Sequence, residues 1–165
     1  MIDPLLNPAD LQTYLHAHGI SGEIIHLAAP TPTVETAAQA METSPEHIVK
    51  SILFLVLDQP VLAITCGTAH VNYRALAAIY GINRKRIKLA SPEVVMSIAG
   101  YEVGAMPPFG HRVPLSTVID QRVLEQSVVY AGGGAENVLV RLSPIDILRV
   151  TQARIEDLLN PPVEG

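Results

Sequence analysis

Two apolar runs separated by a short polar break dominate the hydrophobic pattern of this chain. Residues 49–57 and 60–66 are rich in Val, Ile and Leu, which is typical of buried β-strands. The polar residues 58–59 between them predict a hairpin turn. Shorter apolar runs predict further strands at residues 23–27, 86–89, 113–119, 127–130 and 138–142.

Helix-start signals recur between these strands. Ser44, Ser91 and Ser143 each precede a proline, and an acidic residue follows in the next turn. Serine caps a helix N-terminus, proline is tolerated at the first position, and the acid complements the helix dipole. We therefore expect three helices to begin there. Thr33 and Asn72 are further candidate caps, for helices that reach residues 41 and 80.

The opening segment predicts an amphipathic helix, because Leu11, Tyr14 and Leu15 fall on one face before Gly19. Gly81 supplies a left-handed stop for the helix that Asn72 begins. Strands therefore outnumber helices, and several connections are short. This order predicts a mixed, mostly antiparallel α/β domain, and it does not fit a doubly wound nucleotide-binding fold.

The length and composition favour one compact domain over residues 1–165. The chain is 48% apolar, so a buried core is expected. No apolar run approaches the ~20 residues that span a bilayer, and the N-terminus lacks the regions of a signal peptide. A single cysteine, Cys66, cannot form an internal disulfide. We expect a cytoplasmic protein with no membrane partner.

The distribution of charge limits the contacts with nucleic acid. The formal net charge of −5 argues against a protein that coats DNA or RNA non-specifically. Four of the eleven basic residues nevertheless lie close together: Arg84, Lys85, Arg86 and Lys88. This cluster is either a local phosphate contact or a solvated turn.

Lys50 is the first residue that could carry chemistry, because it lies inside the predicted strand 49–57. A lysine there must reach solvent past the edge of the sheet or direct its ammonium at an anion. The chain has three lysines, so this position is notable. A lysine that only snorkels at the strand end is the alternative.

Two glycine-bearing segments are further candidates. In the first, residues 100–111, the adjacent Pro107 and Pro108 restrict the chain, while Gly104 and Gly110 permit backbone angles closed to other residues. The second, residues 131–135, holds three consecutive glycines between two predicted strands. Each segment can present backbone N–H groups to a ligand. The alternatives are a structural turn for the first segment and a flexible hairpin turn for the second.

Other chemistries lack support. Cys66 and His70 are separated by a predicted loop, so a buried inert thiol is the better interpretation. No Cys or His group has zinc-site spacing, and neither a phosphate-binding Walker motif nor a dinucleotide fingerprint follows the glycines. The Gly-x-Ser-x-Gly motif of serine hydrolases is also missing. We expect no metal and no cofactor.

Taken together, these segments resemble the YbaK/prolyl-tRNA synthetase-associated editing domain family over residues 23–150. Each segment alone is unremarkable, but their order and spacing are specific. The resemblance rests on residues 49–54, 71–76, 87–93, 100–104, 107–110, 120, 131–134 and 142–148.

The resemblance implies a central mixed sheet, partly curled and flanked by helices. It also implies a free-standing enzyme that hydrolyses the ester of a mischarged aminoacyl-tRNA, with a small amino acid and tRNA(Pro) as one substrate. The family's site residues would fall on Lys50, Gly104, Pro108, Gly132, Gly133 and Gly134. Pro107 departs from related proteins, which often carry a small polar residue there, and this puts the amino-acid preference in doubt.

We expect the Lys50 ammonium to project into a hollow that both glycine segments enclose, as an anchor and not as a nucleophile. The glycine amides would stabilise the carbonyl oxygen, and the ribose hydroxyl of the substrate would assist, as the resemblance implies. The cluster of residues 84–88 would contact the tRNA acceptor stem. The expected walls of the amino-acid pocket are Val103, Met106, Pro107, Phe109 and Gly110.

Two other functions remain open. One is a non-catalytic module that binds a ligand bearing adenosine or an amino acid. The other is a domain that docks on an aminoacyl-tRNA synthetase to regulate it. A docking domain predicts an extended exposed apolar patch, which the short, polar-capped elements of this chain do not suggest.

Overall fold

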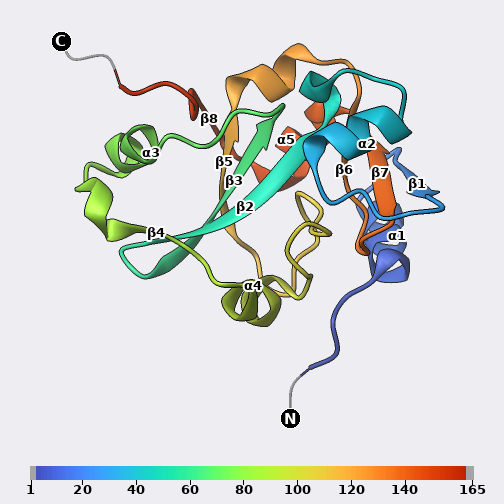
Figure 1. Cartoon of the computed structure of the whole chain (residues 1–165). Helices are drawn as coiled ribbons and strands as arrows, with labels where there is room; N and C mark the ends of the chain where they lie inside the picture. Colours follow the sequence, from blue (N-terminus) through green and yellow to red (C-terminus); the bar gives the residue numbers. More distant parts are fainter. Residues whose placement is uncertain (1–2, 163–165) are drawn as a thin grey trace.

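The hairpin of β2 (Val49–Val56) and β3 (Gln59–Cys66) forms the centre of the larger of two sheets (Figure 1). The computed structural model describes residues 3–162. The two strands pair antiparallel from Val49 opposite Cys66 to Val56 opposite Gln59. The turn falls at Leu57 and Asp58, whose φ angles of 51° and 64° suit a two-residue hairpin. It lies one residue earlier than predicted, because Gln59 extends β3.

Three more strands complete this sheet, in the order β4-β2-β3-β5-β8. β4 (Ile87–Leu89) runs antiparallel to β2, while β5 (Ser116–Asp120) runs parallel to β3. β8 (Arg154–Glu156) pairs parallel with β5. The sequence pattern did not predict β8, because its three residues are mostly exposed and form no apolar run.

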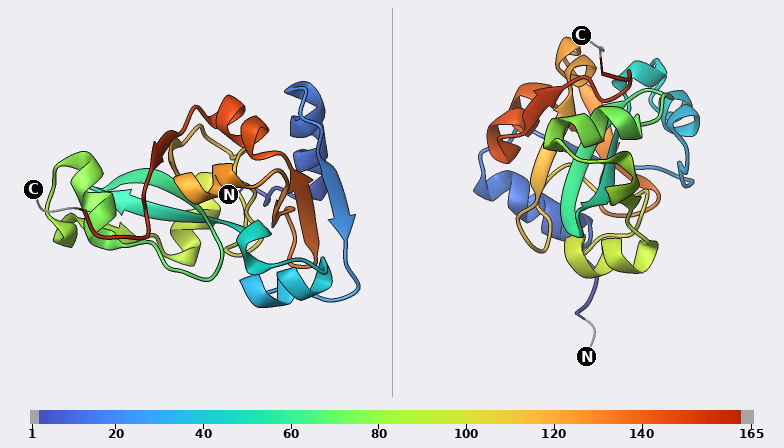
Figure 2. Two further views of the ribbon diagram at one scale, coloured as in Figure 1. Left: turned by 90° about the horizontal axis from the view of Figure 1, so that it is seen from above. Right: turned by 90° about the vertical axis from the view of Figure 1, so that its left-hand side faces the viewer.

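The smaller sheet is antiparallel, with β7 (Val138–Leu142) between β1 (Glu23–His26) and β6 (Val129–Gly132). A single parallel bridge between Ile48 and Tyr130 joins it to the start of β2. Seen from above, β1 and β7 stand at one end of the molecule and α3 at the other (Figure 2). The predicted α/β class, mixed and mostly antiparallel, is confirmed, with the strands divided between two sheets.

The helices follow the predicted caps. Thr33, Asn72 and Ser91 accept backbone hydrogen bonds at the starts of three of them, whereas Ser44 and Ser143 make no such bond. The segment after Ser44 is a 3₁₀ turn, Pro45–His47, and not an α-helix. In the described residues the α-helices are α1 (Pro8–Ala17), α2 (Val34–Ala40), α3 (Tyr73–Tyr80), α4 (Pro92–Ala99) and α5 (Pro144–Thr151). None of these helices is long and apolar enough to cross a membrane.

The core lies on both faces of β2. Val49 and Leu53 pack into the cluster shared with β6, β7 and α1, whereas Phe54 and Val56 pack into the cluster beneath α3. Successive side chains of a strand point to opposite faces, so a strand buried on both faces reads as a continuous apolar run. This explains why residues 49–57 show no polar alternation.

A buried carboxylate fastens the C-terminal segment to the larger sheet. Asp120, at the end of β5, is fully buried and accepts hydrogen bonds from the Leu158 N–H at 2.8 Å and the Arg122 N–H at 2.9 Å. The Arg122 guanidinium also contacts Asp120 at 2.9 Å and Asp157 at 3.0 Å. The Arg122 side chain holds the pKa of Asp157 well below its usual range. This network holds residues 157–158 beside β5.

We predict that Asp120→Ala lowers the free energy of unfolding by roughly 3 kcal/mol, because a buried charge pair loses one partner. Urea unfolding at neutral pH measures the effect. Glu136→Gln, an exposed loop position, is the control and should change stability by less than about 0.5 kcal/mol. Equal stabilities for the two variants would show that the network does not hold the segment.

Candidate functional site

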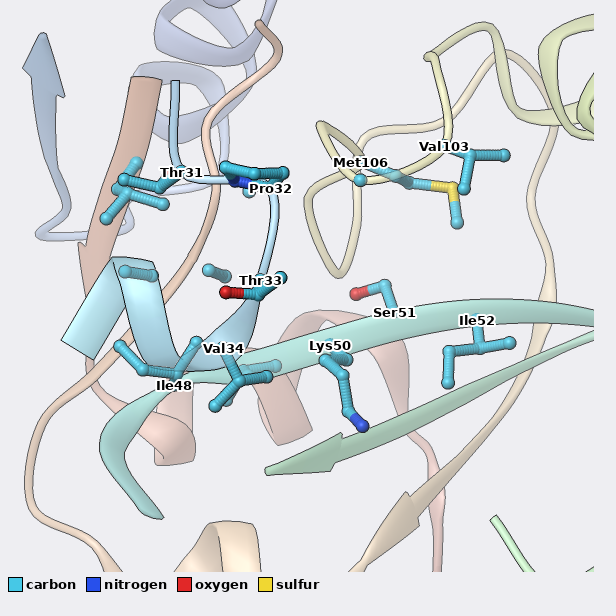
Figure 3. A pocket seen from close by; sticks show the side chains of 16 residues that line it. Thr31, Pro32, Thr33, Val34, Ile48, Lys50, Ser51, Ile52, Val103 and Met106 are labelled. Carbon is cyan, nitrogen blue, oxygen red and sulfur yellow. The ribbon is translucent and has the colours of Figure 1, made fainter. Parts of the chain in front are cut away.

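A pocket of about 220 Å³ lies where the start of β2 approaches the smaller sheet (Figure 3). We call it the β2–β6 pocket. Its walls come from four parts of the chain: the segment before and within α2, residues 48–52, the loop around residues 103–106, and the facing ends of β6 and β7. Among the predicted site residues, those that line it are Lys50, Val103, Gly104, Met106 and Gly132.

Glycine is needed at position 132 because two backbone segments meet there. A Cβ atom on Gly132 would lie 2.6 Å from the Met106 carbonyl oxygen and 2.7 Å from the Ala105 carbonyl carbon. Real Cβ atoms do not approach backbone so closely. The two predicted glycine segments are therefore brought together, and their close contact forms one wall of the pocket.

The amides of the triple glycine differ in availability. The Gly133 N–H donates to the Val138 carbonyl at 2.9 Å, and the Gly134 N–H donates to the Ala105 carbonyl at 2.9 Å. These two donors already have acceptors. The alternation of an antiparallel ladder turns the Gly132 N–H away from β7, towards the edge of β6 that faces the start of β2. Among the described residues, the Gly104 N–H has no hydrogen-bond acceptor. Gly104 thus offers an available amide at the pocket, and the Gly132 amide faces β2 across it.

Lys50 lines the β2–β6 pocket, but its ammonium points to the face of β2 opposite the two glycine segments. Figure 3 shows the Lys50 and Ser51 side chains leaving β2 on opposite sides, with Ser51 on the side of Met106. The Lys50 Nζ donates to the Ala69 carbonyl at 3.1 Å. The expected projection between the two glycine segments is therefore not seen, because the alternation of the strand assigns Lys50 to the other face.

Burial lowers the pKa of the Lys50 amine below its ordinary value, while the carboxylate of Glu35 opposes this shift. Desolvation disfavours the charged amine, and a nearby negative charge favours it. The Lys50 ammonium lies beside α2, which carries Glu35, and beside the loop after β3, which carries Ala69. A polar group of a ligand could take the place of the Ala69 carbonyl there.

The Pro107–Gly110 part of the first glycine segment supports the loop and does not line the β2–β6 pocket. Pro107, Pro108 and Phe109 are buried, and the Phe109 ring stacks on Tyr14 with centroids 5.2 Å apart. Gly110 also packs against Tyr14, which would lie 3.0 Å from an added Cβ atom. These residues were expected at the site, but the two prolines and Phe109 are buried, and Phe109 and Gly110 pack against Tyr14 of α1.

The comparisons with known proteins identify the family. A family model described as an aminoacyl-tRNA editing domain matches residues 28–150, which is most of the chain. The chain belongs to the aminoacyl-tRNA editing domain family. It resembles a solved structure named as a candidate trans-editing enzyme for prolyl-tRNA synthetase, with a TM-score of 0.85 and 29% identity over 93% of this chain and 96% of that one.

Two sequence relatives place this editing domain in different contexts. The uncharacterized protein YwhH of Bacillus subtilis is 22% identical over 88% of this chain and 91% of its own length. The proline–tRNA ligase of Desulfitobacterium hafniense is 31% identical over 65% of this chain, but over only 18% of the ligase. The editing domain therefore has relatives of its own size and relatives within a much larger synthetase.

The sequence pattern did not predict several of the residues that line the β2–β6 pocket. Thr31, Thr33 and Ser51 supply polar groups, and Val34 and Ile48 supply apolar ones. The Ser51 hydroxyl oxygen is buried and has no hydrogen-bond partner among the described residues. Ser51 was detectable as the second polar residue inside an apolar strand. The residues before α2 gave no such signal, because only the tertiary structure brings them to β2.

The Cys66 thiol could in principle act as a nucleophile, but it is not activated in this editing domain. Cys66 is a buried thiol, and burial raises its pKa to about 11. The thiolate, not the thiol, is the nucleophile, so a protonated Cys66 is inert at neutral pH. This agrees with its interpretation as a core residue.

The basic cluster of the editing domain lies on β4 and the turn before it, and none of its residues lines the β2–β6 pocket. Arg84, Lys85 and Arg86 form an exposed 3₁₀ turn, and Lys88 is exposed on β4. The Arg84 guanidinium lies over the Tyr73 ring at 5.9 Å. Within residues 3–162, none of these four side chains forms an ion pair. The cluster can therefore meet an external anion.

We predict that Gly132→Ala destabilises the fold more than Gly104→Ala. The first variant forces backbone apart and should cost about 3 kcal/mol, at the upper end for overpacking. The second only places a side chain at a φ of 87° in open space, which costs about 1–2 kcal/mol. Urea unfolding compares the two. A larger loss for Gly104→Ala would contradict the packing assigned to Gly132.

Proposed function

We propose that this protein is a free-standing aminoacyl-tRNA deacylase that edits in trans. The observation that carries the proposal is the β2–β6 pocket of an editing-domain fold, where Gly104 and Gly132 line one hollow and the Lys50 ammonium lies at its edge, on the other face of β2. The relative named as a candidate trans-editing enzyme and the prolyl-tRNA synthetase relatives support a tRNA substrate, tRNA(Pro) first among them.

The proposed ester hydrolysis requires few catalytic groups from the protein. An aminoacyl ester is already activated, so the site has to hold the substrate, admit one water and stabilise the carbonyl oxygen as it gains charge. Amides directed at that oxygen are suitable donors, and Gly104 and Gly132 supply two. Among the described residues that line the pocket there is no histidine, cysteine, aspartate or glutamate. In the proposed mechanism the ribose hydroxyl next to the ester assists the water.

Small side chains are the proposed targets. The pocket volume of about 220 Å³ is below the ~300–1,000 Å³ typical of sites for drug-sized ligands. Its apolar end is formed by Val34, Ala37, Ile48 and Leu139. A pocket of this kind excludes larger side chains by steric clash, which is the stronger form of selection in an editing sieve.

Lys50 acts in this proposal as a charge at the pocket edge and not as a nucleophile. Within residues 3–162, its ammonium donates one hydrogen bond, to the neutral carbonyl of Ala69, which a phosphate or another electron-rich group of the substrate would replace. The partial desolvation that lowers the pKa of Lys50 would strengthen such a contact.

We predict that the protein deacylates a subset of Ala-, Cys-, Ser- and Thr-tRNA(Pro), and that Lys50→Ala lowers kcat/KM by roughly ten- to hundredfold. Lys50→Arg should keep part of the activity because it keeps the charge. Arg154→Ala, at an exposed residue of β8, is the control and should behave like the wild type. Single-turnover hydrolysis measures the rates.

Undiminished hydrolysis by Lys50→Ala would refute the role of this lysine. Inactivity of the wild type across all four substrates would refute the deacylase itself. A retained affinity for the same tRNAs would then identify a non-catalytic binding module.

The exposed basic cluster is the proposed contact for the acceptor stem. We predict that the double variant Lys85→Glu and Lys88→Glu weakens binding of tRNA by about tenfold or more and lowers the dependence of log Kd on log salt by about 1–2. Arg154→Glu, a charge reversal outside the cluster, is the matched control. Filter binding between low and physiological salt tests this. An unchanged salt dependence would leave the cluster as a solvated turn.

A further inference from the structure

A second, mainly apolar pocket of about 160 Å³ opens beside the β2–β6 pocket. We call it the Leu89 pocket. The two share four lining residues, Ser51, Ile52, Val103 and Met106, so they meet along the middle of β2. The remaining walls of the Leu89 pocket come from the end of β4 and the start of α4. Neither the sequence pattern nor the proposed reaction assigns it a role.

Where the two pockets meet, one edge of β2 is not paired with another strand. The even-numbered residues of β2 bond to β3, since the Gly67 N–H donates to the Ile48 carbonyl in the same register. Odd-numbered residues face the other edge, where the Ala90 N–H donates to the Leu53 carbonyl. β4 reaches no further, and β6 bridges only at Ile48. The backbone N–H and C=O of Ser51 therefore point into the gap between β4 and β6, where neither strand is paired with β2.

The rim of this pocket is unusually apolar for a surface. Leu89 is 58% exposed and Val103 is 61% exposed, and both line the pocket. Two large apolar side chains around an open backbone donor and acceptor suit a flat ligand with apolar faces and a polar edge. An adenine base has this character, because its N6 amino group donates and its ring nitrogens accept.

The position of the Leu89 pocket fits the order of groups at the end of a charged tRNA. On one side lies the β2–β6 pocket, the proposed site for the aminoacyl ester. On the other, Lys88 adjoins Leu89, and β4 leads back to the turn of Arg84–Arg86 (Figure 1). Amino acid, terminal base and phosphates would follow one another in the same order. Each pocket is also smaller than the ~300 Å³ of a typical ligand site, so an aminoacyl-adenosine that enters one would extend into the other.

We propose that the Leu89 pocket, with the open edge of β2 at Ser51, is the subsite for the terminal adenine base of the tRNA. The proposal rests on the proposed deacylase function. The base lies between Leu89 and Val103, with its polar edge on the Ser51 backbone. The buried Ser51 hydroxyl, which has no partner among the described residues, faces the junction where the ribose passes. Met106, a flexible side chain, separates the pockets and adjusts to the ligand.

The test uses two stable ligands and isothermal titration calorimetry. The first is adenosine that carries alanine through an amide at the 3′ carbon, and the second is the same compound without the base. We expect the wild type to bind the first at least about tenfold more tightly than the second. Leu89→Ser should weaken the first by about three- to tenfold, as expected for lost apolar burial, and leave the second unchanged. Ile145→Ser, at a residue 65% exposed on α5, is the matched control.

A third ligand tests the polar edge. Adenosine dimethylated at N6 lacks the donor, so its 3′-alanylamide should bind at least about tenfold more weakly than the parent compound. Equal affinity of the base-free ligand, or an equal effect of Leu89→Ser on both ligands, would overturn the adenine subsite. The deacylase is tested separately by hydrolysis of the tRNA panel, so the failure of one proposal is distinguishable from the failure of the other.

Discussion

The incomplete pairing of β2 is the constraint on which the site depends. One edge of this strand is paired along its whole length with β3, but the other meets only the three residues of β4 and a single bridge to β6. Backbone polar groups that are not paired within a sheet need other partners. The gap between β4 and β6 leaves such groups at Ser51, at the point where both pockets meet. A longer β4 would close the gap and remove the site.

The glycines of this protein serve packing before they serve chemistry. Gly132 allows the end of β6 to touch the Ala105–Met106 backbone, and Gly134 accepts a φ of 99° while it lies against Asn7 and Pro8. Gly133 and Gly134 use their amides within the fold. Of the three consecutive glycines, only Gly132 directs its N–H at the edge of β6 that faces β2. The available amides follow from the hydrogen bonds of the fold and not from the number of glycines.

The position of Lys50 shows how strand geometry divides a site. Lys50 and Ser51 are neighbours in sequence, but they occupy opposite faces of β2 (Figure 3). The lysine contributes charge at the edge beside α2, while the serine faces Met106 and the junction of the pockets. The chemistry is therefore spread around the strand, with amides and apolar walls on one side and the cation on the other.

The sequence by itself determined the elements, because local rules decide them. Caps at Thr33, Asn72 and Ser91, the stop at Gly81 and the apolar runs of β2 and β3 all act within a few residues. The ordered motifs also predicted the family. The tertiary structure decided which residues share a pocket. Phe109 packs against Tyr14 of α1, Thr31 and Val34 reach β2, and Lys50 faces away from the glycine loops. These outcomes depend on long-range packing and strand register.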